Sequence, residues 1–237
     1  MVDSNDHVGF FWFPHTRTAQ LKVNNRTTRG IARRPKVDAF LNDQLLSNVG
    51  FDIINRIGRR MPKAIPRLIS AAMKPGSRVE YVAPGHEVFV SDRRVRFVEM
   101  EYAVPRVHLL EAFSRVRSLI DDLEGPISFP IEVRIQRADD IPLGMASERD
   151  TGYIAVHVYR GTSHTAYFAA VEQIMADYRG RPHWGKLHSQ TAETLAPLYP
   201  GWEAFQTVLA ELDPDGRFSN PYLDRVLRGP DFKSRSA

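Results

Sequence analysis

The 237-residue chain contains no cysteine. Disulfide bridges, thiolate metal sites and cysteine nucleophiles are therefore excluded, and the composition suits a reducing compartment such as the cytosol. No apolar run approaches the roughly 20 residues of a membrane span. The N-terminal residues also lack the basic and apolar segments of a signal peptide. We therefore expect a cytoplasmic protein without a transmembrane segment.

Several fingerprints of catalytic and nucleotide sites are missing as well. There is no G-x-G-x-x-G turn, no P-loop and no G-x-S-x-G elbow, so nothing obvious cradles a pyrophosphate or builds a serine nucleophile. His183 and His188 are five residues apart, which is a poor helical spacing for one metal ion, and no glutamate completes a zinc-protease arrangement. We predict no metal site.

The remaining composition is that of an ordinary globular protein. Apolar residues make up 43% and charged residues 25%, and the formal net charge is +4. The length suits one large domain or two small ones. Basic residues concentrate in 26–36, 56–74 and 93–96. Solvated faces explain them better than a phosphate-binding surface, and we expect no nucleic-acid partner.

Apolar periodicity predicts a series of strands and helices. The expected strands cover residues 9–14, 19–25, 78–83, 87–90, 95–103, 130–136 and 152–160, and the expected helices cover 37–60, 62–74, 106–123, 163–178 and 201–212. This order favours an α+β fold with a mainly antiparallel sheet covered by helices. Residues 229–237 are expected to fray.

The strand expected at 130–136 carries polar side chains on one face. Glu132, Arg134 and Gln136 alternate with Ile131, Val133 and Ile135. A carboxylate and a guanidinium two residues apart can pair and bind a hydroxylated ligand. The alternative, a strand with one solvated face, is favoured from this pattern alone.

His157 lies on the polar and aromatic face of the strand expected at 152–160. If this strand neighbours 130–136, His157 can lie across from Glu132 or Arg134. An isolated sheet histidine is the alternative.

The segment Arg181-Pro182-His183-Trp184-Gly185-Lys186-Leu187-His188 combines groups that an apolar core does not need. Lys186 can orient a hydroxyl or stabilise developing negative charge; the alternative is a turn around a packed tryptophan. Glu99 and Glu101 share a strand face, as an acid–base pair would. For these two carboxylates we favour a solvated strand face.

Five stretches, taken in order, resemble the aldonolactone oxidases and dehydrogenases, which are flavoproteins of the vanillyl-alcohol-oxidase type. They are Phe11-Trp12-Phe13-Pro14-His15-Thr16; Glu99-Met100-Glu101-Tyr102 with Pro105; Glu132-Val133-Arg134; His183-Trp184-Gly185-Lys186; and Leu212-Asp213-Pro214 with Gly216, Phe218 and Asn220. The family includes D-arabinono-1,4-lactone oxidases, L-gulono-1,4-lactone oxidases or dehydrogenases, and alditol oxidases.

The resemblance implies oxidation of a sugar-1,4-lactone or polyol by hydride transfer to flavin N5. It implies catalytic roles for Lys186, Glu132 and Arg134, with Glu132 holding Arg134. It places His157, His183, Trp184, His188 and Asn220 on the substrate or flavin side of the pocket.

The resemblance also implies a two-domain enzyme in which residues 1–228 form the C-terminal cap, or substrate, domain. The N-terminal domain that binds FAD is expected to be absent from this chain, either supplied in trans or lost, so that the chain alone is inactive. Peripheral membrane association is implied for relatives. The alternative is a truncated, non-catalytic binding module with the same fold.

Overall fold

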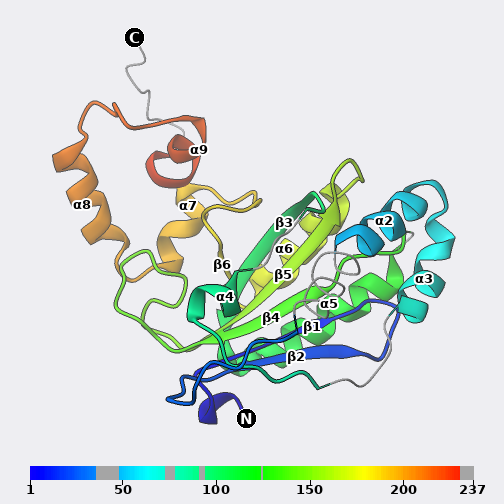
Figure 1. The fold of residues 1–237 in the computed structure, drawn as a ribbon. Coiled ribbons are helices and arrows are strands. Elements are labelled where there is room, and N and C mark those ends of the chain that lie inside the picture. Colours follow the sequence, from blue (N-terminus) through cyan, green and yellow to red (C-terminus); the bar gives the residue numbers. More distant parts are fainter. Residues whose placement is uncertain (36–47, 73–77, 91–93, 124, 230–237) are drawn as a thin grey trace. The chain divides into compact units, whose positions relative to one another are not determined.

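The computed structural model describes residues 1–35, 48–72, 78–90, 94–123 and 125–229 (Figure 1). Six strands form one sheet in the order β2-β1-β4-β5-β3-β6. The strands are β1 (His7–Trp12), β2 (Ala19–Asn24), β3 (Phe97–Pro105), β4 (Ile131–Gln136), β5 (Thr151–Tyr159) and β6 (Arg181–Pro182). The predicted α+β fold with a mainly antiparallel sheet is confirmed.

The helices lie before, between and after the strands. They are α2 (Phe51–Arg60), α3 (Ile65–Ala72), α4 (Gly85–Phe89), α5 (Leu109–Asp122), α6 (Thr165–Asp177), α7 (Ala192–Leu195), α8 (Trp202–Leu212) and α9 (Pro221–Leu223), joined by single helical turns that include η5 (Ala196–Leu198). None of the described helices is long and apolar enough to cross a membrane.

The chain divides into two compact units. Unit 1 comprises Met1–Glu99, Arg117–Val133 and Val156–His164, and unit 2 comprises Met100–Val116, Arg134–Ala155 and Thr165–Ala237. Strands β3, β4 and β5 contribute residues to both units.

In unit 1, the aromatic run near the N-terminus forms a hairpin. β1 pairs with β2 in antiparallel register from His7 opposite Asn24 to Trp12 opposite Ala19. The connecting turn is held by Thr16, whose hydroxyl donates to Phe13 O at 2.8 Å. The hairpin predicted from residues 9–25 is therefore confirmed, one or two residues earlier than expected.

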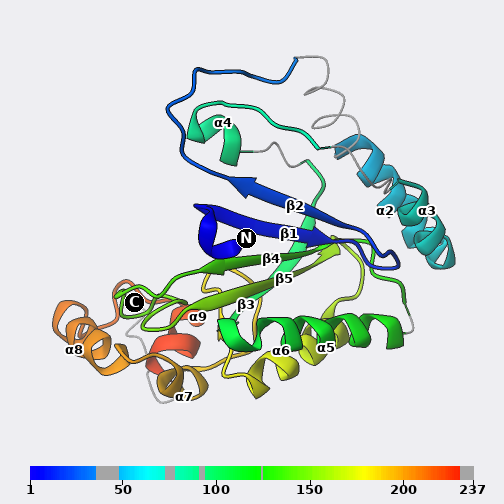
Figure 2. The ribbon, with the colours of Figure 1, turned by 90° about the horizontal axis from the view of Figure 1, so that it is seen from below.

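Helices α5 and α6 lie side by side (Figure 2), and α6 and residues 109–116 of α5 belong to unit 2. Arg115 of α5 donates to Asp177 of α6 at 2.7 Å, and Tyr102 of β3 donates to Glu172 of α6. Both helices present apolar stripes at helical spacing, as the sequence predicts. Buried members of these stripes are Leu109, Ala112, Val116 and Ile120 in α5 and Tyr167, Val171 and Ile174 in α6.

The C-terminal helices of unit 2 surround a small apolar core of their own (Figure 1). Its buried members are Ala192, Leu195, Tyr199, Trp202 and Val226, and Trp184 packs against them. The packing of Trp184 against this core holds the segment that follows β6 in place.

Two strand predictions are wrong. Residues 78–83 form only an isolated bridge, Ala32 to Val82, and residues 85–89 form the helical turn α4 instead of a strand. Pro84 ends the extended segment, and Glu87 in the first turn suits a helix N-terminus. The short elements β6, α7 and α9 were not predicted. Part of the helix predicted at 37–60, and residues 230–237 of the tail, lie outside the described residues.

Candidate functional site

A buried carboxylate in unit 2 gathers two cationic side chains. Glu101 on β3 is 1% exposed. Arg134 Nη2 lies 2.6 Å from its Oε1 and 2.8 Å from its Oε2, and Lys186 Nζ donates to Oε2. We call Glu101, Arg134 and Lys186 the Glu101 cluster.

The sheet brings Arg134 and Glu101 together from separate strands, and Lys186 comes from the segment that follows β6. β5 lies between β4, which carries Arg134, and β3, which carries Glu101. Neighbouring strands are about 4.8 Å apart, so Arg134 must span two strand spacings. Its guanidinium does so over the ring of Tyr153 on β5, 5.8 Å from the ring centroid. Tyr153 is itself fixed by donating to Gln136 Oε1 at 2.7 Å.

Lys186 approaches Glu101 from the opposite side, on the segment that follows β6. This segment begins beside β3, because β6 pairs with Tyr102 and Ala103 and His183 N donates to Glu101 O at 2.9 Å. A turn closed by Lys186 N donating to His183 O at 3.0 Å follows. The lysine is therefore positioned by the same strand that carries its carboxylate partner.

The far end of the Lys186 segment is anchored to helix α6. Ser189 donates from its backbone N to Glu172 Oε1 at 2.9 Å and from its hydroxyl to Oε2, and Tyr102 donates to the same carboxylate. Burial opposes ionisation of Glu172, but these hydrogen bonds outweigh burial and hold its pKa below the ordinary value. Burial and the neighbouring Glu172 raise the pKa of Tyr102, which stays a neutral donor.

The Glu101 cluster joins two cationic side chains to one carboxylate. The side chains of Arg134 and Lys186 are 46% and 17% exposed, and both reach solvent. Guanidinium and ammonium groups held in this way can bind hydroxyl or carbonyl oxygens and stabilise an oxyanion. The arrangement suits a polyhydroxylated ligand that develops negative charge on oxygen.

His157 lies in unit 1, where it is 5% exposed. Its Nε2 is 3.0 Å from Glu99 Oε1 and its Nδ1 is 3.2 Å from Pro130 O. Both ring nitrogens therefore lie within hydrogen-bond distance of an oxygen acceptor. Phe97 contacts the ring edge-on and Phe129 stacks on it. The predicted proximity of β4 and β5 is confirmed, but the carboxylate that contacts His157 is Glu99.

Four other predicted site residues have clear structural contacts. His183 Nδ1 accepts from Gly185 N at 3.1 Å, and Trp184 Nε1 donates to Leu143 O at 2.9 Å. Asn220 caps α9, because its Oδ1 accepts from Tyr222 N and Leu223 N, both at 3.0 Å. These contacts shape the chain around Lys186 and the turn before α9.

His188 is linked to the same region through Tyr222. Tyr222 donates to Trp184 O at 2.5 Å, so His188 Nε2, 3.0 Å from the tyrosine oxygen, is the donor of that pair. Its Nδ1 is buried and has no hydrogen-bond partner in the structure. Burial, together with nearby Arg225, lowers the pKa of His188 to about 4.

The solvated face favoured for Glu99 and Glu101 is wrong. Both carboxylates are covered and bonded, Glu99 to His157 and Glu101 to the two cations. The expected alternation in β4 is correct, since Ile131 and Val133 are buried and Arg134 is exposed. The recurrence of two glutamates in an otherwise apolar strand was the available signal for a polar cluster inside the sheet.

Within the described ranges, no group of three or more histidine, aspartate or glutamate side chains is placed to hold a metal ion. The donors of the Glu101 cluster are cationic, and such a set favours anionic or hydroxylated ligands over metals.

Comparison with known proteins gives one consistent family. Residues 1–226 match the family model described as D-arabinono-1,4-lactone oxidase. L-gulono-1,4-lactone dehydrogenase of Mycobacterium tuberculosis is 46% identical over 231 residues, which are 97% of this chain and 53% of that protein. L-gulonolactone oxidase of Scyliorhinus torazame is 27% identical over 95% of this chain and 52% of its own length. Alditol oxidase of a Streptomyces species is 34% identical over 56% of this chain.

The chain thus spans about half the length of the first two of these relatives. The match covers all the residues of the Glu101 cluster and both units. By this match, the chain belongs to the D-arabinono-1,4-lactone oxidase family.

Proposed function

We propose that this chain forms the substrate side of an FAD-dependent oxidoreductase that oxidises a sugar-1,4-lactone of the D-arabinono or L-gulono type. The observation that carries the proposal is the convergence of Arg134 and Lys186 on buried Glu101. These side chains come from three separate stretches of the family match. Cationic donors that reach solvent suit a substrate whose hydroxyl oxygen becomes negative during oxidation.

The donor set also fits a flavin. A reduced isoalloxazine gathers negative charge, and a fixed guanidinium or ammonium nearby stabilises it. Arg134 and Lys186 would lie on the ring side of the site, while the remainder of the cofactor would be held by an FAD-binding domain outside this chain. FAD, when bound, supplies the two-electron acceptor for the oxidation.

The residues of the Glu101 cluster take distinct roles in this proposal. Lys186 donates a hydrogen bond to the reacting hydroxyl and stabilises its oxygen as the proton leaves. Arg134 polarises and orients the substrate. Glu101 positions both cations, and the resemblance further implies that Glu132 holds Arg134. Glu132, on the same face of β4 as Arg134, keeps a proposed place on the substrate side, together with His157.

Lactone binding to the chain itself provides a direct test. Titration with L-gulono-1,4-lactone or D-arabinono-1,4-lactone, followed by NMR chemical shifts, should perturb Tyr153 and residues 183–188. Lys186→Met should weaken binding by about tenfold, the cost of one charged hydrogen bond. Lys63→Met, an exposed lysine of unit 1, is the matched control. Equal binding by both variants would contradict the proposed role of Lys186.

The redox part of the proposal needs a separate measurement. The chain is mixed with the separately produced FAD-binding half of a relative, and bleaching of flavin absorbance by lactone is followed without oxygen. Bleaching that requires this chain and is lost in Lys186→Met supports the oxidoreductase. Lactone binding without bleaching, in a mixture shown to form a complex, would favour a non-catalytic binding module.

A further inference from the structure

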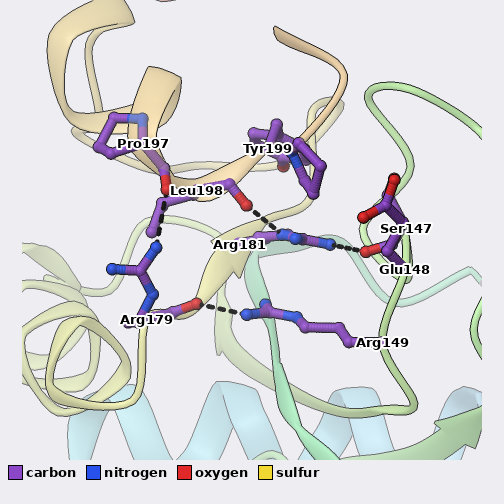
Figure 3. Close-up of a pocket in the computed structure, with 9 residues that line it drawn as sticks. Ser147, Glu148, Arg149, Arg179, Arg181, Pro197, Leu198 and Tyr199 are labelled. Carbon is purple, nitrogen blue, oxygen red and sulfur yellow. Dashed lines mark hydrogen bonds between the residues drawn. The ribbon is translucent and has the colours of Figure 1, made fainter.

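Unit 2 contains a cavity of about 320 Å³ that uses no residue of the Glu101 cluster. Arg149, Arg179, Arg181 and Tyr199 line it, together with the turn at Ser147 and helical turn η5. Figure 3 shows the three arginines and Tyr199 around this space, with their bonds to backbone oxygens dashed. We call these four residues the arginine pocket.

The three arginines are held by backbone carbonyls. Arg181 donates from Nε to Leu198 O at 2.7 Å and from Nη1 to Met145 O and Ser147 O, and is 4% exposed. Arg149 donates to Arg179 O and Ala103 O, both at 3.0 Å. Arg179 donates to Pro197 O at 2.7 Å. Carbonyl acceptors fix the guanidinium planes but carry no formal charge, and Glu148 and Asp139 offset part of the positive charge of Arg181.

Within the described part of the chain, none of the three arginines forms an ion pair. The one carboxylate at the cavity, Glu148, is exposed. Burial and the neighbouring Arg181 lower the pKa of Arg149 to about 10, and burial lowers the pKa of Arg181 as well. A bound anion would relieve the repulsion that the three positive charges exert on one another.

Two buried polar atoms of the arginine pocket have no hydrogen-bond partner. They are the hydroxyl of Tyr199, a residue only 3% exposed, and Nε of Arg149. A buried donor without a partner is unfavourable, because its hydrogen bond to water is lost and not replaced. Burial raises the pKa of Tyr199, so its hydroxyl is a neutral donor. Both atoms belong to residues that line the cavity.

The backbone at Arg179 gives an independent indication. Helix α6 ends in a Schellman motif, in which Gly180 N donates to Met175 O and Arg179 N donates to Ala176 O, both at 2.9 Å. Arg179 takes the left-handed position of this motif, with φ of 51°, where glycine is the favoured residue. Glycine would adopt this backbone conformation at a lower conformational free energy, yet the chain has an arginine here. The Arg179 side chain lines the cavity.

We propose that the arginine pocket binds a small oxyanion, the phosphate or carboxylate group of a metabolite. The planar guanidinium forks of Arg149, Arg179 and Arg181 match the geometry of such groups. The Tyr199 hydroxyl supplies a further donor. The volume exceeds that of inorganic phosphate alone, so the ligand can carry additional atoms beyond its anionic group. This site is independent of lactone oxidation.

Isothermal titration of the whole chain with inorganic phosphate, at fixed ionic strength set with chloride, tests the proposal. We expect one saturable site per chain. Arg179→Gln should lower the affinity at least tenfold, and Tyr199→Phe about threefold or more. Arg217→Gln, an exposed arginine of the same unit, should bind like the unaltered chain. Arg181 is unsuitable for substitution because its guanidinium donates hydrogen bonds to three backbone carbonyl oxygens.

A parallel titration with acetate distinguishes the source of the oxyanion. Saturable binding of phosphate alone supports a phosphate-bearing ligand, and binding of acetate supports a carboxylate. An Arg149 Nε–H resonance that shifts on saturation would place the ligand in the cavity. Absence of saturable heat with both anions, or equal affinity in Arg179→Gln and Arg217→Gln, would overturn the proposal.

Discussion

Arg134 reaches across strand β5 and places its Nη2 2.6 Å from Glu101 Oε1, on the strand beyond. The carboxylate is almost fully buried, whereas the guanidinium remains partly in solvent. One glutamate inside the sheet thereby fixes two cations, one from strand β4 and one from the segment that follows β6. This geometry makes Glu101 the residue on which the shape of the candidate site depends.

Glu101→Gln should destabilise the chain and disorder the site. It removes the negative charge that Arg134 and Lys186 share, and breaking a buried pair in this way costs about 3 kcal/mol. Urea unfolding at neutral pH measures the loss. A double-mutant cycle with Lys186→Met isolates the coupling, which we expect to be favourable by about 1 kcal/mol or more. A coupling energy near zero would contradict a shared carboxylate.

Glu172 should contribute stability that is lost in acid. Its pKa is lower in the folded chain than in the unfolded chain. The contribution is therefore complete above the ordinary glutamate pKa and disappears as pH falls through the folded value. Glu172→Gln should unfold more easily at pH 7, by about 1–2 kcal/mol, and show a shallower loss between pH 5 and 3. Glu203→Gln, on an exposed face of α8, is the control.

His188 should titrate far below an ordinary histidine. Its imidazole proton signals are expected to move with a midpoint near pH 4 in an NMR titration. Below about pH 6.5, His188 binds a proton in the unfolded chain but stays neutral in the folded chain. The free energy of unfolding therefore falls as the pH drops towards 4. Arg225→Gln removes a nearby positive charge that helps to lower the pKa of His188. The midpoint should therefore rise, but it should stay below the ordinary histidine value because the ring is still buried. A midpoint near 6.5 in the unaltered chain would refute the buried, neutral ring.

Two glycines near the site should respond differently to alanine. A Cβ at Gly180 would lie 2.7 Å from Met175 O, whereas a Cβ at Gly185 would meet nothing closer than His183 at 3.5 Å. Gly180→Ala should therefore cost about 2 kcal/mol of unfolding free energy. Gly185→Ala should cost less than about 0.5 kcal/mol and leave lactone binding unchanged. Comparable losses in the two variants, measured by thermal unfolding, would contradict this packing.

Periodicity predicted the long elements because their burial follows from their own residues. The α5 stripe and the alternation of β4 are local patterns, and both are confirmed. Lys186 and Arg134 were identified from residue type and family motif. Glu101, which contacts both side chains, was not identified as their partner. The residues meet only through the order of the strands in the sheet, and no local sequence pattern encodes that order.

The strand errors have a similar origin. Val79, Val82, Val88 and Val90 suggest extended chain, yet a strand also needs a neighbour that supplies its hydrogen bonds. Residues 78–83 find only the bridge at Ala32. The arginine pocket also escaped prediction, because Arg149 is 30 residues away from Arg179 along the chain and meets Arg179 and Arg181 only in the folded structure.

The left-handed arginine at the end of α6 has a consequence for any effort to engineer this protein. Glycine at position 179 would relax the backbone, and a screen for heat resistance would favour that replacement. The same replacement would remove one of the three guanidinium groups around the cavity. Thermal robustness and anion recognition therefore compete for a single side chain, and variants selected for one property should lose the other.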